Sequence, residues 1–104
     1  MNKFDEREKS FEKKFARDEE LQFKISVKSN KYLGEWVSGK LGKTEEEKKE
    51  YIQEIIKIDL EKAGKEDVFK KVIQDFKAVP TSVDEAEIRD QMEKALSRAK
   101  EDYK

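Results

Sequence analysis

Residues 4–24 read FDEREKSFEKKFARDEELQFK, and the rest of the chain is organised around this stretch. Phe4, Phe11 and Phe15 are seven and four residues apart, so a helix places them in one narrow apolar stripe. Nearly every residue between them is charged, and opposite charges recur four residues apart, which stabilises a helix by roughly 0.2–0.5 kcal/mol per pair. The stripe fits either the first helix of an ordinary bundle or an arm that binds in a partner's groove. Its narrowness and its charge density favour the arm.

The composition restricts the class of protein. The chain has 104 residues, of which 47% are charged and 35% hydrophobic, and its formal net charge is −1. These values fit one small domain without the basic excess of a nucleic-acid-binding protein. The absence of cysteine and histidine excludes disulfides, Cys or His metal sites, thiol nucleophiles and His-dependent triads. No stretch reaches the roughly 20 apolar residues of a membrane span, and the N-terminus has no apolar signal core, so we expect a cytoplasmic protein without direct membrane insertion.

The first helix is predicted to be long. Asn2 is a candidate N-cap, and no helix-breaking residue follows before Gly34, so the helix is expected from about residue 4 to about residue 37. Apolar residues are sparse before Leu21 and frequent after it. We therefore predict an N-terminal arm at residues 1–18, mobile in the free protein, and a helical bundle at residues 19–104.

The second helix is marked by turn and capping residues. Gly39 and Gly42 predict a loop after the first helix. Thr44 followed by Glu47 is a capping-box signature, which predicts that a helix begins there. This helix is expected to end at Gly64, because glycine is the usual residue just past a helix end.

Two further helices complete the predicted fold. The third stops before Pro80, and Ser82 with Glu85 repeats the capping-box pattern at the start of the last. Short loops between four amphipathic helices predict an all-α protein, a small four-helix bundle with a long first helix. The predicted common core consists of Leu33, Trp36, Ile52, Ile55, Val72, Ile73, Phe76, Ile88, Met92 and Leu96.

One stretch comes close to a phosphate-binding loop. Residues 34–41 read GEWVSGKL, with Lys40 after the second glycine. The loop also needs Ser or Thr at the next position, where Leu41 stands, and it needs a preceding strand. A helix end followed by a loop is therefore the favoured interpretation. Paired carboxylates such as Glu45 and Glu47 lie in runs of charge, which favours solvated helix faces over acid–base catalysis.

Three blocks of residues carry a resemblance to a known family. They are Phe4-Asp5-x-Arg7-Glu8-x-x-Phe11-Glu12-x-Lys14-Phe15-x-x-Asp18 with Leu21-x-Phe23-Lys24, then Asn30-Lys31-x-Leu33-Gly34-x-Trp36, and then Glu66-Asp67-Val68-Phe69-Lys70-Lys71-Val72-x-x-Asp75-Phe76. The blocks are similar to the zeta subunits of bacterial F-type ATP synthases, and the resemblance covers essentially the whole chain.

The resemblance implies a four-helix protein that is not an enzyme and that inhibits ATP hydrolysis by the catalytic head of the synthase. Its arm would become a helix wedged between catalytic and non-catalytic subunits, near the rotor, and would block rotation in the hydrolytic direction. The free protein would be a monomer that needs no cofactor and binds ATP or ADP weakly, held at the inner membrane only through the synthase. The implied partner-binding residues are Phe4, Asp5, Arg7, Glu8, Phe11, Glu12, Lys14, Phe15 and Asp18.

Two other functions fit the sequence. One is a helical domain that binds or hydrolyses adenine nucleotide through Lys40, and the other is an adaptor that docks its first helix on an unrelated partner. The lack of histidine, cysteine and a Ser or Thr at position 41 disfavours the nucleotide enzyme. Only the family resemblance disfavours the adaptor.

Overall fold

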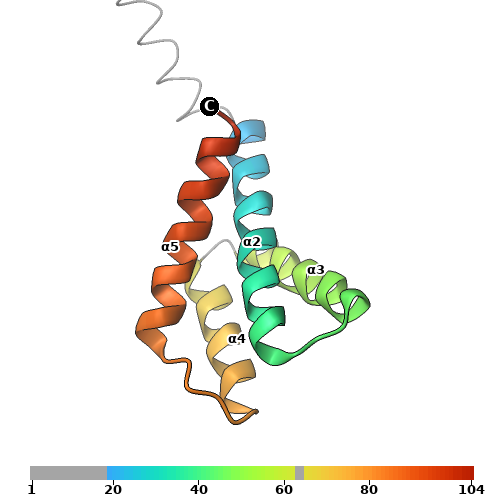
Figure 1. The fold of residues 1–104 in the computed structure, drawn as a ribbon. Coiled ribbons are helices and arrows are strands. Elements are labelled where there is room, and N and C mark those ends of the chain that lie inside the picture. Colours follow the sequence, from blue (N-terminus) through green and yellow to red (C-terminus); the bar gives the residue numbers. More distant parts are fainter. Residues whose placement is uncertain (1–18, 63–64) are drawn as a thin grey trace, which may run out of the picture.

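The computed structural model describes residues 19–62 and 65–104, which form four helices (Figure 1). They are α2 (Glu19–Leu41), α3 (Glu45–Lys62), α4 (Lys65–Lys77) and α5 (Glu85–Asp102). Over these two ranges there is no strand, and the predicted all-α class is confirmed. The part of the first helix predicted before residue 19 lies outside the described residues. None of the described helices is long and apolar enough to cross a membrane.

Each of the four described helices packs against two others around one core. α2 packs against α5 and α3, and α4 packs against α3 and α5. In Figure 1, α2 and α5 run in opposite directions, and the C-terminus lies at the end of the bundle where α2 begins. α3 and α4 lie beside the other half of this pair, near the α2–α3 loop. The α2–α5 pair therefore extends beyond the other two helices.

One apolar core joins all four helices, as their amphipathic patterns predict. Its members, each at most 6% exposed, are Leu33, Val37, Tyr51, Ile55, Val68, Phe69, Val72, Phe76, Ile88 and Ala95. Trp36 packs against this core through an edge-to-face contact with Phe76, with 5.7 Å between the ring centroids. Such a pair contributes about 0.5–1.5 kcal/mol beyond the area that it buries.

The predicted core is largely confirmed. Five of its ten residues are members of the core cluster, namely Leu33, Ile55, Val72, Phe76 and Ile88. Three more pack against the cluster and are partly buried, namely Trp36, Ile73 and Met92. Ile52 is buried outside the cluster, beside Gly34, and Leu96 is only partly buried. Only Leu96 departs from the prediction, because helix spacing gives the apolar face but not how completely a neighbour covers each position.

The two predicted capping boxes have opposite outcomes. At α3, the Thr44 amide donates to Glu47 Oε1 at 2.9 Å, and the Glu47 amide donates to Thr44 Oγ1 at 3.2 Å, so the box is confirmed. At α5, the prediction of Ser82 with Glu85 is wrong. Asp84 is the N-cap instead, and its carboxylate accepts from the Glu87 amide at 2.8 Å. A carboxylate is as good a cap as a hydroxyl, and it also favours the positive end of the helix dipole.

The predicted loop at Gly39 is also corrected, because α2 continues through Gly39 to Leu41. The helix ends at Gly42, whose φ of +70° is in the left-handed region that glycine adopts without strain. The Lys43 amide donates to the Ser38 carbonyl at 3.0 Å, and the Gly42 amide donates to the Gly39 carbonyl at 3.4 Å. This pair of hydrogen bonds is the Schellman motif, which pairs the last helical carbonyls.

A second glycine allows α2 and α3 to approach closely. A Cβ added at Gly34 would lie 2.6 Å from Cγ1 of Ile52 and 3.3 Å from its Cα. Gly34 is buried within α2. Glycine has a low helix propensity, but a larger residue at this position would leave no room for α3. The contact fixes where the two helices cross.

Candidate functional site

The predicted partner-binding residues lie in the N-terminal segment outside the described residues. They are Phe4, Asp5, Arg7, Glu8, Phe11, Glu12, Lys14, Phe15 and Asp18. The next residue in the chain, Glu19, begins α2. The structure therefore describes the helix that leads into this segment and the bundle that carries it.

The middle of α2 is attached to the last turns of α5. Ile25 on α2 is 2% exposed and Ala99 on α5 is fully buried. The Tyr32 hydroxyl donates to Asp102 Oδ2, and the Arg98 guanidinium lies 3.9 Å from the centre of the Tyr32 ring. The hydrogen bond to Asp102 is the main reason that the pKa of Tyr32 is raised. These contacts hold α2, the helix that follows the N-terminal segment, against α5.

The structure does not support a phosphate-binding loop at residues 34–41. All eight residues belong to α2, so their backbone amides are used in the helix rather than gathered into a cradle. Gly34 contacts Ile52, and the Lys40 side chain is exposed. The predicted helix end is confirmed, but the loop begins at Gly42 and not at Gly39, and Lys40 does not belong to a phosphate-binding loop.

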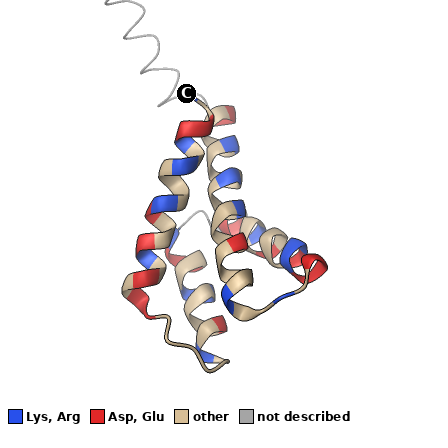
Figure 2. Cartoon of the chain, in the orientation of Figure 1, with Lys and Arg blue, Asp and Glu red and all other residues tan. Residues whose placement is uncertain are grey.

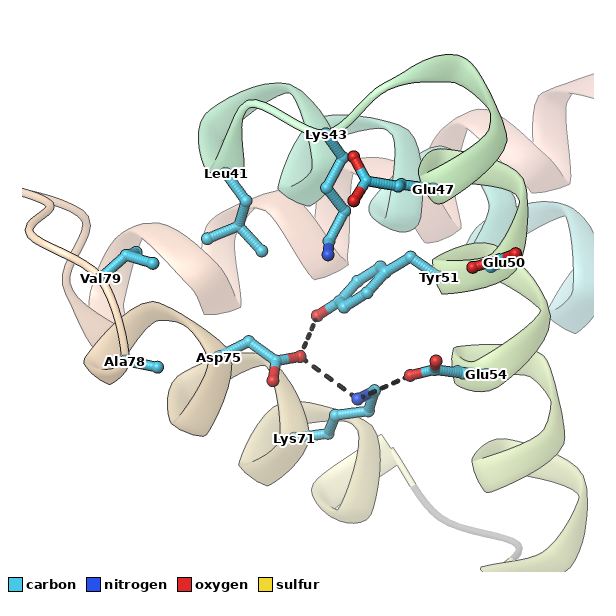
Figure 3. A pocket seen from close by; sticks show the side chains of 10 residues that line it. All are labelled: Leu41, Lys43, Glu47, Glu50, Tyr51, Glu54, Lys71, Asp75, Ala78 and Val79. Carbon is cyan, nitrogen blue, oxygen red and sulfur yellow. Dashed lines mark hydrogen bonds and ion pairs between the residues drawn. The ribbon is translucent and has the colours of Figure 1, made fainter.

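A polar pocket of about 350 Å³ lies between α3, α4 and the loop after α2 (Figure 3). The Tyr51 hydroxyl donates to Asp75 Oδ2 at 2.6 Å. The Lys71 ammonium lies 3.3 Å from the same oxygen and 3.0 Å from Glu54 Oε2. The ammonium groups of Lys43 and Lys71 are each 5.2 Å from the centre of the Tyr51 ring. These contacts form one charged network that ties α3 to α4.

Burial and charge fix the protonation of this network. Burial and the hydrogen bond to Asp75 raise the pKa of Tyr51 far above its usual value, so the hydroxyl stays a neutral donor. Partial burial lowers the pKa of Lys71, but its bonds to Glu54 and Asp75 outweigh burial and raise the pKa overall. Four carboxylates and two ammonium groups line the pocket, so its charge does not favour a phosphate. We interpret the network as structural.

A second network, which sequence reasoning missed, joins three helices at Asp59. The Asp59 carboxylate accepts from the Ser26 hydroxyl at 2.5 Å and from the Asn30 amide at 2.9 Å, and the Lys65 ammonium lies 3.5 Å away. Burial raises the pKa of Asp59, but these hydrogen bonds and the charge of Lys65 outweigh it, so the pKa lies below its usual value. Ser26 is 33 residues from Asp59, so no local sequence signal marks the pair.

Charges of both signs are spread over the four described helices (Figure 2). Both signs occur along α2 and α5, and some of these residues form ion pairs, such as Lys94 with Asp90 at 3.0 Å. In the part of the chain that the structure describes, no group of three or more acidic residues is arranged to hold a metal ion. The described helices thus present mixed polar surfaces.

Comparison with known protein families assigns the chain to a family. A family model described as ATPase inhibitor subunit zeta matches residues 1–102. The chain belongs to this family. The match confirms the resemblance seen in the three sequence blocks, and it includes the N-terminal segment as well as the zeta bundle. No curated protein matches the chain.

Proposed function

We propose that the protein inhibits ATP hydrolysis by the catalytic head of the F-type ATP synthase. Residues 1–18 bind as a helix at an interface between catalytic and non-catalytic subunits, near the rotor, and block rotation in the hydrolytic direction. The observation that carries this proposal is the family match over residues 1–102, whose description names an ATPase inhibitor subunit. The four-helix core supports it, because residues of all four described helices form one apolar cluster that can carry an N-terminal arm.

The energetics of residues 1–18 favour folding on a partner. Burying Phe4, Phe11 and Phe15 contributes roughly 5–9 kcal/mol in total. Ordering the backbone costs on the order of 1 kcal/mol per residue. Helical hydrogen bonds and surface ion pairs offset only part of that cost, so the segment by itself is expected to be marginal. A groove in the catalytic head supplies the missing apolar contacts.

The remaining properties follow from this role. The protein acts as a regulator rather than an enzyme, as a monomer in the cytoplasm that reaches the inner membrane through the synthase. Inhibition requires no cofactor. Weak binding of ATP or ADP is a further expectation, for which none of the described residues stands out as a site.

Deletion of the N-terminal segment tests the proposal. A chain lacking residues 1–15 is expected to lose inhibition of ATP hydrolysis by the purified catalytic head and to keep the unfolding transition of the bundle, because the four described helices and their common core remain. Steady-state hydrolysis rates and thermal unfolding followed by circular dichroism measure the two properties. Lys40→Ala is the control and should inhibit like the wild type. Full inhibition by the shortened chain would overturn the proposal.

A double substitution localises the effect within the segment. Phe11→Ala with Phe15→Ala is expected to raise the half-inhibitory concentration by at least about a hundredfold, because each buried Phe truncated to Ala costs roughly 3–5 kcal/mol in a well-packed site. Lys48→Ala with Lys49→Ala, on α3, is the matched double control and should change inhibition by no more than about twofold. Equal inhibition by the two double variants would mean that the phenylalanine stripe is not the contact.

A further inference from the structure

An apolar slot lies between α2, α5 and the start of α4. Its floor is formed by Leu33 on α2 with Met92 and Leu96 on α5, and Ser29 lies beside them on α2. The slot encloses about 190 Å³, enough to accept one large apolar side chain. Met92 and Leu96 are only partly buried. We call it the α2–α5 slot.

The two cations that line the slot, Lys65 and Arg89, already have acidic partners. The Lys65 ammonium lies 3.5 Å from Asp59 Oδ2. The Arg89 guanidinium donates to both carboxylate oxygens of Glu66, at 3.0 and 3.3 Å, and stacks on the Phe69 ring at 3.7 Å. With these cations engaged, the slot suits an apolar side chain better than an anion.

The register of the chain relates this slot to the phenylalanine stripe. Phe11 precedes Ser29, and Phe15 precedes Leu33, by 18 residues each. Eighteen residues are five whole turns at about 3.6 residues per turn, a rise of about 27 Å. If the N-terminal segment binds as a helix that continues α2, both phenylalanines therefore lie on the side of that helix that carries the slot.

We propose that the α2–α5 slot is a second docking point on the catalytic head, and this inference rests on the proposed function. An apolar side chain of the head, about five turns along the helix from the phenylalanine groove, occupies the slot. Two contacts on one side of one helix fix the rotation of the bundle about the helix axis. The head then holds the inhibitor at the bundle as well as at residues 1–18. The slot thereby adds affinity through a second, linked contact.

Matched Leu→Glu substitutions on the full chain test this docking point. Leu96 lines the slot, whereas Leu60 on α3 is 53% exposed and lies outside it. Leu96→Glu is expected to raise the half-inhibitory concentration for ATP hydrolysis by at least about tenfold, because it places a carboxylate in an apolar contact. Leu60→Glu should change it by no more than about twofold. Thermal unfolding of the free variants verifies that both bundles are folded.

A labelling experiment makes the test independent of stability. The chain has no cysteine, so a single introduced cysteine reacts uniquely within it. Glu93→Cys lies at the slot, and Lys57→Cys lies on an exposed position of α3. With maleimide modification followed by mass spectrometry, binding to the purified head should slow labelling at position 93 by at least about tenfold and leave position 57 within about twofold.

The results separate the two proposals. If wild-type chain inhibits but Leu96→Glu inhibits equally well, or position 93 stays fully reactive in the complex, the slot is not a docking point. Faster labelling of free Glu93→Cys after removal of residues 1–15 would overturn the inference, because the chain's own N-terminal segment would then fill the slot. Slower labelling at high concentration of free chain would assign the slot to a second copy, with the same consequence. Absence of inhibition by wild-type chain would remove the proposed function and the slot proposal together.

Discussion

The N-terminal and C-terminal halves of α2 are attached to α3 by different interactions. In the N-terminal half, Ser26 and Asn30 donate hydrogen bonds to the Asp59 carboxylate. In the C-terminal half, Gly34 packs directly against Ile52, and Val37 is fully buried in the core. A polar attachment depends on the charge of one carboxylate, whereas a packed attachment depends on shape. The half nearest the N-terminal segment is thus the one that pH can weaken.

The largest effect on stability is expected at the packed half. Gly34→Val adds a branched side chain where even a Cβ would lie 2.6 Å from Ile52, so it should lower the free energy of unfolding by about 2–3 kcal/mol. Gly39→Ala is the matched control in the same helix, because nothing lies within 4 Å of a Cβ added there. It should be neutral or stabilising by up to about 1 kcal/mol. Urea unfolding of both variants measures the difference, and equal stability would show that α2 and α3 can separate without cost.

The polar half is expected to respond to pH. The pKa of Asp59 is lower in the folded state than in the unfolded chain. Between these two pKa values, the unfolded state therefore binds more protons than the folded state does. The stability from Asp59 is present above the unfolded pKa and is lost as the pH falls through the folded pKa. At pH 7, Asp59→Asn should cost about 1–2 kcal/mol through the loss of charged hydrogen bonds. The gap between wild type and variant should shrink as the pH falls below the ordinary pKa of an aspartate, and a constant gap would contradict this assignment.

A pair of serines in α2 gives the smallest and sharpest comparison. The Ser26 hydroxyl donates to Asp59, whereas the Ser38 hydroxyl is buried with no hydrogen-bond partner among the described residues. Ser26→Ala should therefore destabilise the bundle by about 1–2 kcal/mol. Ser38→Ala should be neutral or stabilising by up to about 1 kcal/mol, because it removes an unsatisfied polar group and improves helix propensity. Chemical unfolding at pH 7 tests the opposite signs, and equal destabilisation by both changes would contradict the contrast.

Local signals in the sequence determined the number of helices, their approximate ends and most of the core. The capping box at Thr44 is an interaction over three residues, and apolar spacing identifies Leu33, Ile55 and Val72 as inward-facing without knowledge of their partners. The same reasoning was wrong at Ser82 because Asp84 offers an equally good cap two residues later. It also ended α2 too early, because Gly39 is compatible with a helix when the Schellman motif at Gly42 follows.

Only the tertiary structure decided how the helices meet. The Asp59 network, the pocket around Tyr51 and the α2–α5 slot each combine residues from at least two helices. Each brings together residues that are more than 20 positions apart in the sequence, such as Ser26 with Asp59 and Tyr51 with Asp75. Helical periodicity repeats every 3.6 residues and carries no information about which face of one helix opposes which face of another. Conversely, the phenylalanine stripe and the family assignment rest on the sequence alone, because they depend on residue spacing and identity rather than on any packed neighbour.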